Sequence, residues 1–162
     1  MPQNEIVIHV PPAHSDQRGQ IINFLRYVPE AQGFKIPDLP KDIPDDTFVE
    51  VASFNFLNKG DIRANHYHPD GLNQFVYCLA GSYESYSQKI KLNKKGEPEA
   101  AGEVQKIIVK AGDIVFTPSM IAHAMKALAP NTVALNLNPR LRDHDHYYKS
   151  DKPHTLPFKL IQ

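Results

Sequence analysis

The chain has a single cysteine, no tryptophan and no excess of charge of either sign. The lone Cys78 excludes an intramolecular disulfide and is typical of a protein of the reducing cytoplasm. Eighteen basic and eighteen acidic residues give a formal net charge of zero. No overall field therefore draws the protein to nucleic acid or to an anionic membrane, although a local basic pocket could still bind a phosphorylated small molecule.

Long apolar runs are also missing. No stretch approaches the length of a membrane span, and the first ten residues lack the basic and apolar regions of a signal peptide. We therefore expect a cytoplasmic protein without a membrane segment. Its 162 residues suffice for one domain with its own core. Fourteen prolines and eight glycines interrupt the chain throughout, which favours many short strands over long helices.

Alternation of apolar and polar residues predicts strands at 47–56 and 132–138, and β-branched or apolar runs between turn signals predict the others. The expected strands are 6–10, 20–26, 47–56, 62–68, 73–80, 82–92, 103–110 and 132–138. The proline-rich segment 29–46 is too long for a simple connection and is typical of a lid, an arm or a partner-contacting segment. We expect one domain with a core at about 47–138, an N-terminal arm at 1–46 and a C-terminal tail at 139–162.

His66 and His68 are the first candidate site residues. They lie two apart in a β-prone run, so both imidazoles would project from the same face of a strand. Two adjacent histidines are unsuited to plain core packing, because each ring carries polar nitrogens that need partners when buried. A wet or metal-lined pocket explains them better.

A short echo links this region to a second one. Gly60-Asp61-Ile62 and Gly112-Asp113-Ile114 each open a strand, and each is followed by a segment that carries histidine. The echo suggests two related halves of one barrel.

Both segments resemble the two motifs of the cupin superfamily. The positions that match are Gly60, His66, His68 and Gly81 in the first motif and Gly112, Pro118 and His123 in the second. The departures are Gln74 for a glutamate, Met120 for a glycine and Ala127 for an asparagine. The resemblance implies an all-β, single-domain cupin, a double-stranded β-helix or jelly-roll barrel.

The same resemblance raises the question of a metal. His66, His68 and His123 can present three imidazoles to one divalent cation such as Zn, Ni, Mn or Fe, with the amide oxygen of Gln74 as a fourth ligand. A neutral amide is a poorer ligand than the carboxylate that cupins have there. In the alternative, Gln74 hydrogen-bonds the histidines and the pocket works without metal.

A narrower resemblance favours this alternative. Segments 16–21 and 62–68 resemble those of cupins that act on nucleotide-linked 4-keto-6-deoxy sugars, namely the 3,5-epimerases and the 3,4-ketoisomerases. These enzymes generally need no metal. By position, the resemblance makes His66 the base and His68 a second base or orienting partner. It makes Arg18 and Arg63 the phosphate and sugar contacts, with Gln74 and His123 also lining the substrate site.

The chemistry is consistent with these residue types. Isomerising a ketosugar requires removing a proton next to a carbonyl and returning it elsewhere, which suits a histidine with a near-neutral pKa. Arginine matches a diphosphate through paired hydrogen bonds. Tyr147 or Tyr148 is the candidate general acid, although a tyrosine covering the edge of the core is the plainer interpretation. His144 and His146 belong either to a solvated tail or to a second metal site or lid.

Two other functions stay open. One is a metal-dependent cupin, such as a dioxygenase or a small-acid or sugar isomerase, and the other is a cupin that binds a small ligand without catalysis. In each case we expect a homodimer, because cupins commonly pair through an edge strand or an exchanged N-terminal arm.

Overall fold

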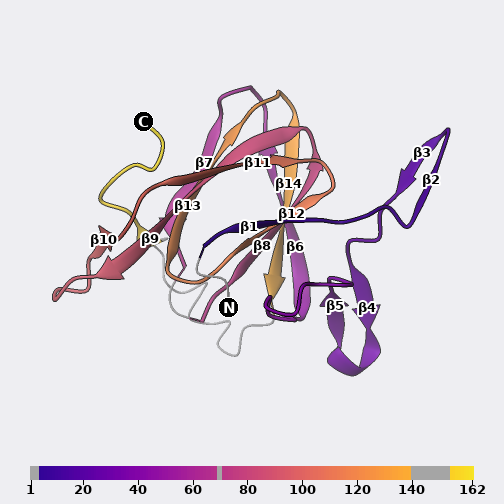
Figure 1. The fold of residues 1–162 in the computed structure, drawn as a ribbon, viewed down its shortest axis with the longest axis horizontal. Coiled ribbons are helices and arrows are strands. Elements are labelled where there is room, and N and C mark those ends of the chain that lie inside the picture. The colour runs from indigo at the N-terminus through magenta and orange to yellow at the C-terminus, as the bar shows by residue number, and fades with distance from the viewer. Residues whose placement is uncertain (1–3, 69–70, 140–153) are drawn as a thin grey trace.

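The computed structural model describes residues 4–68, 71–139 and 154–162. In these residues the regular secondary structure is almost entirely β, and the one helical element is the 3₁₀ turn η1, Pro29–Ala31. Two sheets curl around a common interior, as Figure 1 shows. The expected all-β barrel of the cupin type is confirmed.

The first sheet has seven strands in the order β1-β12-β8-β14-β6-β5-β4. Their bounds are Ile6–His9 (β1), Asp113–Thr117 (β12), Gln74–Ala80 (β8), Thr132–Pro139 (β14), Phe48–Phe56 (β6), Gly33–Lys35 (β5) and Arg26–Val28 (β4). All pairings in it are antiparallel. The expected arm therefore contributes β1 directly to the barrel, where Ile6 pairs with Phe116.

The second sheet has the order β10-β9-β13-β7-β15, and a further strand, β11, also pairs with β9. The bounds are Pro98–Ala100 (β10), Ser82–Leu92 (β9), Ile121–Ala127 (β13), Ile62–Tyr67 (β7), His154–Thr155 (β15) and Gln105–Lys110 (β11). β15 belongs to the expected C-terminal tail, so part of that tail is built into the sheet.

The expected strand at 20–26 is wrong as a single element. The hairpin of β2 (His14–Asp16) and β3 (Gly19–Ile21) ends at Ile21, and β4 begins only at Arg26. The residues between them leave the ladder because their side chains cover the outer face of the first sheet. Phe24, for example, stacks on Tyr77 with ring centroids 4.0 Å apart.

Three apolar clusters hold the fold together. The first lies between the outer face of the seven-stranded sheet and the arm, and includes Ile36 and Ile43. The second fills part of the barrel interior between the two sheets, where Tyr83 and Met125 are buried. The third joins the outer face of the second sheet to the C-terminal residues around Leu160. Both ends of the chain are thus needed to cover apolar sheet faces.

The echo between the two glycine-led segments is a matching pair of turns. Gly60 and Gly112 both have left-handed backbones, with φ of 91° and 96°. Asp61 Oδ2 accepts a hydrogen bond from the backbone N–H three residues earlier at 2.8 Å, and Asp113 Oδ2 does the same at 2.9 Å. The same three residue types therefore start β7 and β12 in the same way.

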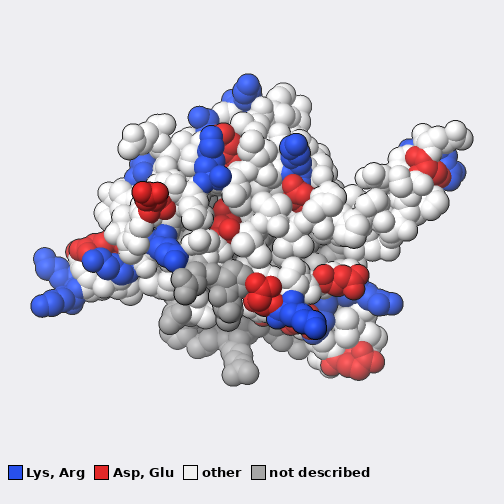
Figure 2. All heavy atoms as spheres, in the orientation of Figure 1, with Lys and Arg blue, Asp and Glu red and all other residues white. Residues whose placement is uncertain are grey.

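The surface mixes charges of both signs. On the face drawn in Figure 2, basic and acidic side chains alternate without a large patch of either sign.

None of the helical structure in the described residues is long and apolar enough to cross a membrane.

Candidate active site

Three histidines from two neighbouring strands form the centre of the site. His66 in β7 pairs directly with His123 in β13, and His68 follows β7 immediately. The ring centroids are 5.0 Å apart for His66 and His68, 4.7 Å for His66 and His123, and 5.1 Å for His68 and His123. The structure therefore brings the two motifs together, and one nitrogen from each ring lies within 4.8 Å of the others.

A β-bulge sets the direction of His66. The register between β7 and β13 shifts next to His123, and Ala64 and Asn65 both have left-handed backbones with φ of 66° and 78°. Asn65 fastens the bulge to the C-terminal segment, because its Nδ2 donates to the carbonyl of Phe158 and its Oδ1 accepts from the N–H of Leu160. Bulges of this kind re-aim a side chain at the end of a ladder.

His123 is held as a neutral imidazole. Its side chain is only 2% exposed, and burial is the main reason that its pKa lies well below the usual value, with His68 and His66 adding to the effect. Its Nδ1 lies 3.2 Å from the carbonyl of Ile121, which makes Nδ1 the protonated nitrogen. The buried Nε2 then has a lone pair directed away from this bond and, among the residues that the structure describes, no hydrogen-bond partner. His123 is thus suited to accept a hydrogen bond or to ligate a cation.

Gln74 faces the barrel interior but bonds to another amide. Its Nε2 donates to Oδ1 of Asn136 at 3.0 Å, and both side chains are buried. The contact continues along β14, where Asn136 Nδ2 donates to Asn138 Oδ1 and Asn138 Nδ2 donates to Glu50 Oε2 at 3.0 Å. A row of polar side chains from the first sheet therefore shares the barrel with the histidines of the second.

A buried carboxyl group lies in the same interior. Glu5, next to β1, is 6% exposed, and its Oε1 accepts a hydrogen bond from Thr117 Oγ1 at 2.7 Å. Burial raises the pKa of Glu5, although hydrogen bonds from Thr117 and Ser85 oppose the shift. Since Thr117 belongs to the first sheet and Ser85 to the second, this carboxyl group links the two halves of the barrel.

Arg63 bonds to groups that lie away from the row of polar side chains that ends at Glu50. Its Nε and Nη2 donate to the carbonyl of Asn55 at 3.2 and 2.8 Å, and its guanidinium lies 5.6 Å from the centre of the Phe56 ring. These partners are at the end of β6 opposite to Glu50. Its predicted contact with substrate stays a prediction.

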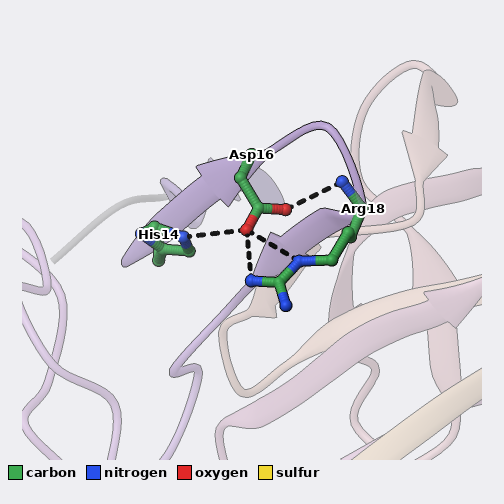
Figure 3. A network of polar contacts seen from close by, with 3 residues as sticks. All are labelled: His14, Asp16 and Arg18. Carbon is green, nitrogen blue, oxygen red and sulfur yellow. Dashed lines mark hydrogen bonds and ion pairs between the residues drawn. The ribbon is translucent and has the colours of Figure 1, made fainter.

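Arg18 lies on the β2–β3 hairpin, which projects away from the barrel in Figure 1. Its side chain is 83% exposed, and its Nη2 is 2.7 Å from Oδ2 of Asp16. Figure 3 shows Asp16 held from three directions, by the guanidinium and backbone N–H of Arg18 and by His14. The Arg18 guanidinium, followed by its backbone N–H, lowers the pKa of Asp16. The hairpin does not bring Arg18 to the histidines of its own barrel.

Several sequence expectations concern residues outside the described part of the chain. Tyr147, Tyr148, His144 and His146 all lie in this group. Conversely, four residues of the barrel interior were not expected in the site: Glu5, Thr117, Asn136 and Asn138. Asn136 and Asn138 carry the signal that identified the histidines, because they are polar residues two apart in a strand whose other residues after Thr132 are apolar.

The three imidazoles have the chemistry of a metal site. Imidazole nitrogens suit a divalent transition metal, and the bond from His123 Nδ1 to a backbone carbonyl is the outer contact that orients such a ligand. Gln74 uses its Nε2 for Asn136, so only its Oε1 could join. Cys78 is no alternative nucleophile, because burial raises the pKa of its thiol to about 12.

The fold and the histidine cluster together define a protein of cupin architecture. No family model matches the sequence, and no curated protein matches it. Solved structures do match, among them the sugar 3,4-ketoisomerase QdtA from Thermoanaerobacterium thermosaccharolyticum in complex with TDP. That match has 19% identity and a TM-score of 0.59, and it covers 91% of this chain and 93% of that one.

Two further structures extend the comparison. The TDP-quinovose 3,4-ketoisomerase WlaRB from Campylobacter jejuni is 16% identical over 88% of this chain and 90% of that one, with a TM-score of 0.57. The dTDP-4-dehydrorhamnose 3,5-epimerase from Sulfolobus tokodaii is 16% identical over 85% and 70%, with a TM-score of 0.59. The chain therefore has the fold of the sugar-nucleotide ketoisomerases and epimerases.

Proposed function

We propose that the protein is an isomerase or epimerase of a nucleotide-linked 4-keto-6-deoxy sugar that acts by histidine-mediated proton transfer. The observation that carries the proposal is the cluster of His66, His68 and His123 in a barrel whose fold is that of enzymes of this class. One of those neighbours, a 3,4-ketoisomerase variant, was solved in complex with TDP-4-keto-6-deoxyglucose.

His66 is the proposed base. It is the most exposed of the three histidines, whereas His68 and His123 are buried. It removes the proton from the carbon next to the keto group, and the electron pair moves to the carbonyl oxygen to give an enediolate. In an isomerase the proton returns to the former carbonyl carbon while the proton of the neighbouring hydroxyl passes to the enediolate oxygen; in an epimerase it returns to the opposite face of the same carbon. His68 acts as the second base or orients His66, and neutral His123 accepts a hydrogen bond from the sugar.

The proposal includes a homodimer. Val49 and Val51 lie on one face of β6 and remain 41% and 44% exposed, close to the exposed Tyr27 and Phe34 of the β4–β5 hairpin. A second copy of the chain would cover this apolar surface. The projecting β2–β3 hairpin would then carry Arg18 to the partner, where its guanidinium could bind a diphosphate.

Proton exchange provides the direct test of the reaction. Incubation of the protein with TDP-4-keto-6-deoxyglucose in D₂O should place deuterium next to the keto group, as followed by NMR. His66→Asn should abolish this incorporation. A wild-type protein that incorporates no deuterium with thymidine- or uridine-linked ketosugars would refute the proposal.

Thermal shift tests the binding role of arginine. A nucleotide-linked ketosugar should raise the melting temperature of the wild-type protein, and Arg18→Ala should abolish the increase. Arg26→Ala removes an exposed arginine from the neighbouring hairpin and is the matched control. Equal increases in melting temperature in all three proteins would show that Arg18 does not bind the nucleotide sugar.

The histidine geometry also supports a second candidate, a metal-dependent cupin with His66, His68 and His123 as ligands and Gln74 Oε1 as a fourth. A bound divalent ion would supply Lewis-acid or redox chemistry there. Deuterium exchange by protein treated with a chelator distinguishes the two, because the favoured mechanism needs no metal.

A further inference from the structure

The amide groups behind the site form a chain with one direction. Gln74 donates to Asn136, Asn136 donates to Asn138, and Asn138 donates to Glu50. Each link uses an amide nitrogen on the side of the barrel interior and an oxygen on the side of Glu50. The chain runs from a side chain that is 7% exposed to one at the surface.

The residue at the outer end determines this direction. An ionised carboxylate only accepts hydrogen bonds, whereas an asparagine or glutamine amide can turn either end toward a neighbour. Glu50 therefore requires Asn138 to present its Nδ2, which leaves Oδ1 of Asn138 facing Asn136. The same step repeats at Asn136, and Gln74 must then turn its Nε2 toward Asn136.

The last link determines what Gln74 presents to the site. Gln74 lies two residues before Val76 on β8, and Val76 packs in the interior cluster with Met125. Met125 lies two residues after His123 on β13. Gln74 and His123 therefore face the same interior from opposite sheets. With Nε2 turned toward β14, the amide end directed away from β14 is the acceptor Oε1.

We infer that Glu50, acting through Asn138 and Asn136, is a positioning residue that makes Gln74 Oε1 a hydrogen-bond acceptor for a hydroxyl group of the ligand. The consequence for specificity is clear, because a ligand with a carbonyl at this position would meet a second acceptor and leave both oxygens unpaired. The contact between Gln74 and a ligand hydroxyl rests on the proposed function. The direction of the hydrogen bonds between the amides does not depend on it.

Two substitutions at Glu50 test whether this residue sets the direction of the amide hydrogen bonds or only contacts Asn138. Glu50→Lys replaces an acceptor with a donor, so every amide in the chain should turn over and Gln74 should accept from Asn136. Glu50→Gln can serve as either, so both directions become available. Glu30→Lys adds the same charge at an exposed carboxylate on η1 and is the matched control.

The direction of the hydrogen bond between Gln74 and Asn136 is measured by NMR on protein labelled with ¹⁵N and ¹³C. In the wild type, a coupling through the hydrogen bond should join Gln74 Nε2 to Asn136 Cγ. In Glu50→Lys it should be replaced by one that joins Asn136 Nδ2 to Gln74 Cδ. Persistence of the wild-type coupling in Glu50→Lys would overturn the inference.

The effect on binding is measured with TDP-4-keto-6-deoxyglucose. Glu50→Gln should raise Kd about 2-fold, because roughly half of the molecules keep the competent orientation. Glu50→Lys should raise Kd roughly 10-fold or more, although its added positive charge favours a diphosphate. Reversed amides with unchanged affinity would overturn the role in specificity. If the wild type binds no nucleotide sugar, the proposed function fails, while the amide couplings still decide the direction of the chain.

Discussion

The backbone N–H of Met120 donates a hydrogen bond to the carbonyl of His68, with N and O 3.0 Å apart. Met120 has φ of 61°, the left-handed conformation that glycine adopts readily. It stands where the cupin motif has a glycine, so the turn is retained although the residue type is not. This bond joins the turn before β13 to the end of β7, and it thereby holds His68 and His123 in one cluster.

The left-handed backbone at Met120 predicts an unequal response to two isomeric substitutions. Met120→Leu keeps the side-chain volume, whereas Met120→Ile adds β-branching that is strongly disfavoured at positive φ. Met120→Ile should lower the free energy of unfolding by about 1–2 kcal/mol more than Met120→Leu. Urea denaturation measures the difference, and equal stabilities would contradict a strained turn.

Burial of Glu5 predicts a pH-dependent stability. Because the folded pKa is raised above the ordinary value of 4.5, the stabilising contribution is complete below that pH. It is lost as the pH rises toward the folded pKa, since the unfolded chain releases its proton first. Glu5→Gln removes this loss. The melting temperature of the variant, relative to that of the wild type, should therefore rise with pH, by about 2–4 °C for each kcal/mol of stability that the wild type loses.

Melting curves between pH 4 and pH 9 test this expectation. Glu103→Gln makes the same substitution at an exposed carboxyl group and is the matched control. A constant difference between Glu5→Gln and the wild type would show that Glu5 does not titrate abnormally.

The projecting hairpin predicts complementation between two inactive variants. Arg18→Ala and His66→Asn should each be inactive alone. If Arg18 serves the partner's site, a mixed dimer has one complete site, and random mixing should restore about a quarter of wild-type activity. Deuterium incorporation after co-expression measures this. Absence of any recovery would mean that Arg18 acts within its own chain or not at all.

Metal removal separates the two candidate functions. In the favoured mechanism, protein treated with a chelator should retain its deuterium incorporation, because His66 needs no metal to move a proton. Elemental analysis of untreated protein and of His123→Asn completes the test. Stoichiometric metal that is lost in the variant, together with loss of exchange on chelation, would favour the metal-dependent cupin.

Local sequence predicted many of the strands. Period-two alternation predicted β6 closely, because its less exposed residues alternate from Ala52 to Phe56, and the expected hairpin arm at 82–92 coincides with β9. The run from Ile22 to Leu25 has the same apolar and β-branched composition, yet its residues pack on the sheet outside the ladder. Composition cannot distinguish a paired strand from an apolar cover, because both bury their side chains.

The sequence by itself determined the residue types of the site and their spacing. His66 and His68 share a face because strand periodicity is a local property of the backbone. Only the tertiary structure decided which groups meet. Glu5 and Thr117 are 112 residues apart, Gln74 and Asn136 are 62 apart, and the antiparallel register brings each pair together. The exposure of Arg18 was likewise decided by the path of the hairpin, because a turn signal specifies where a chain reverses but not where the hairpin lies on the molecule.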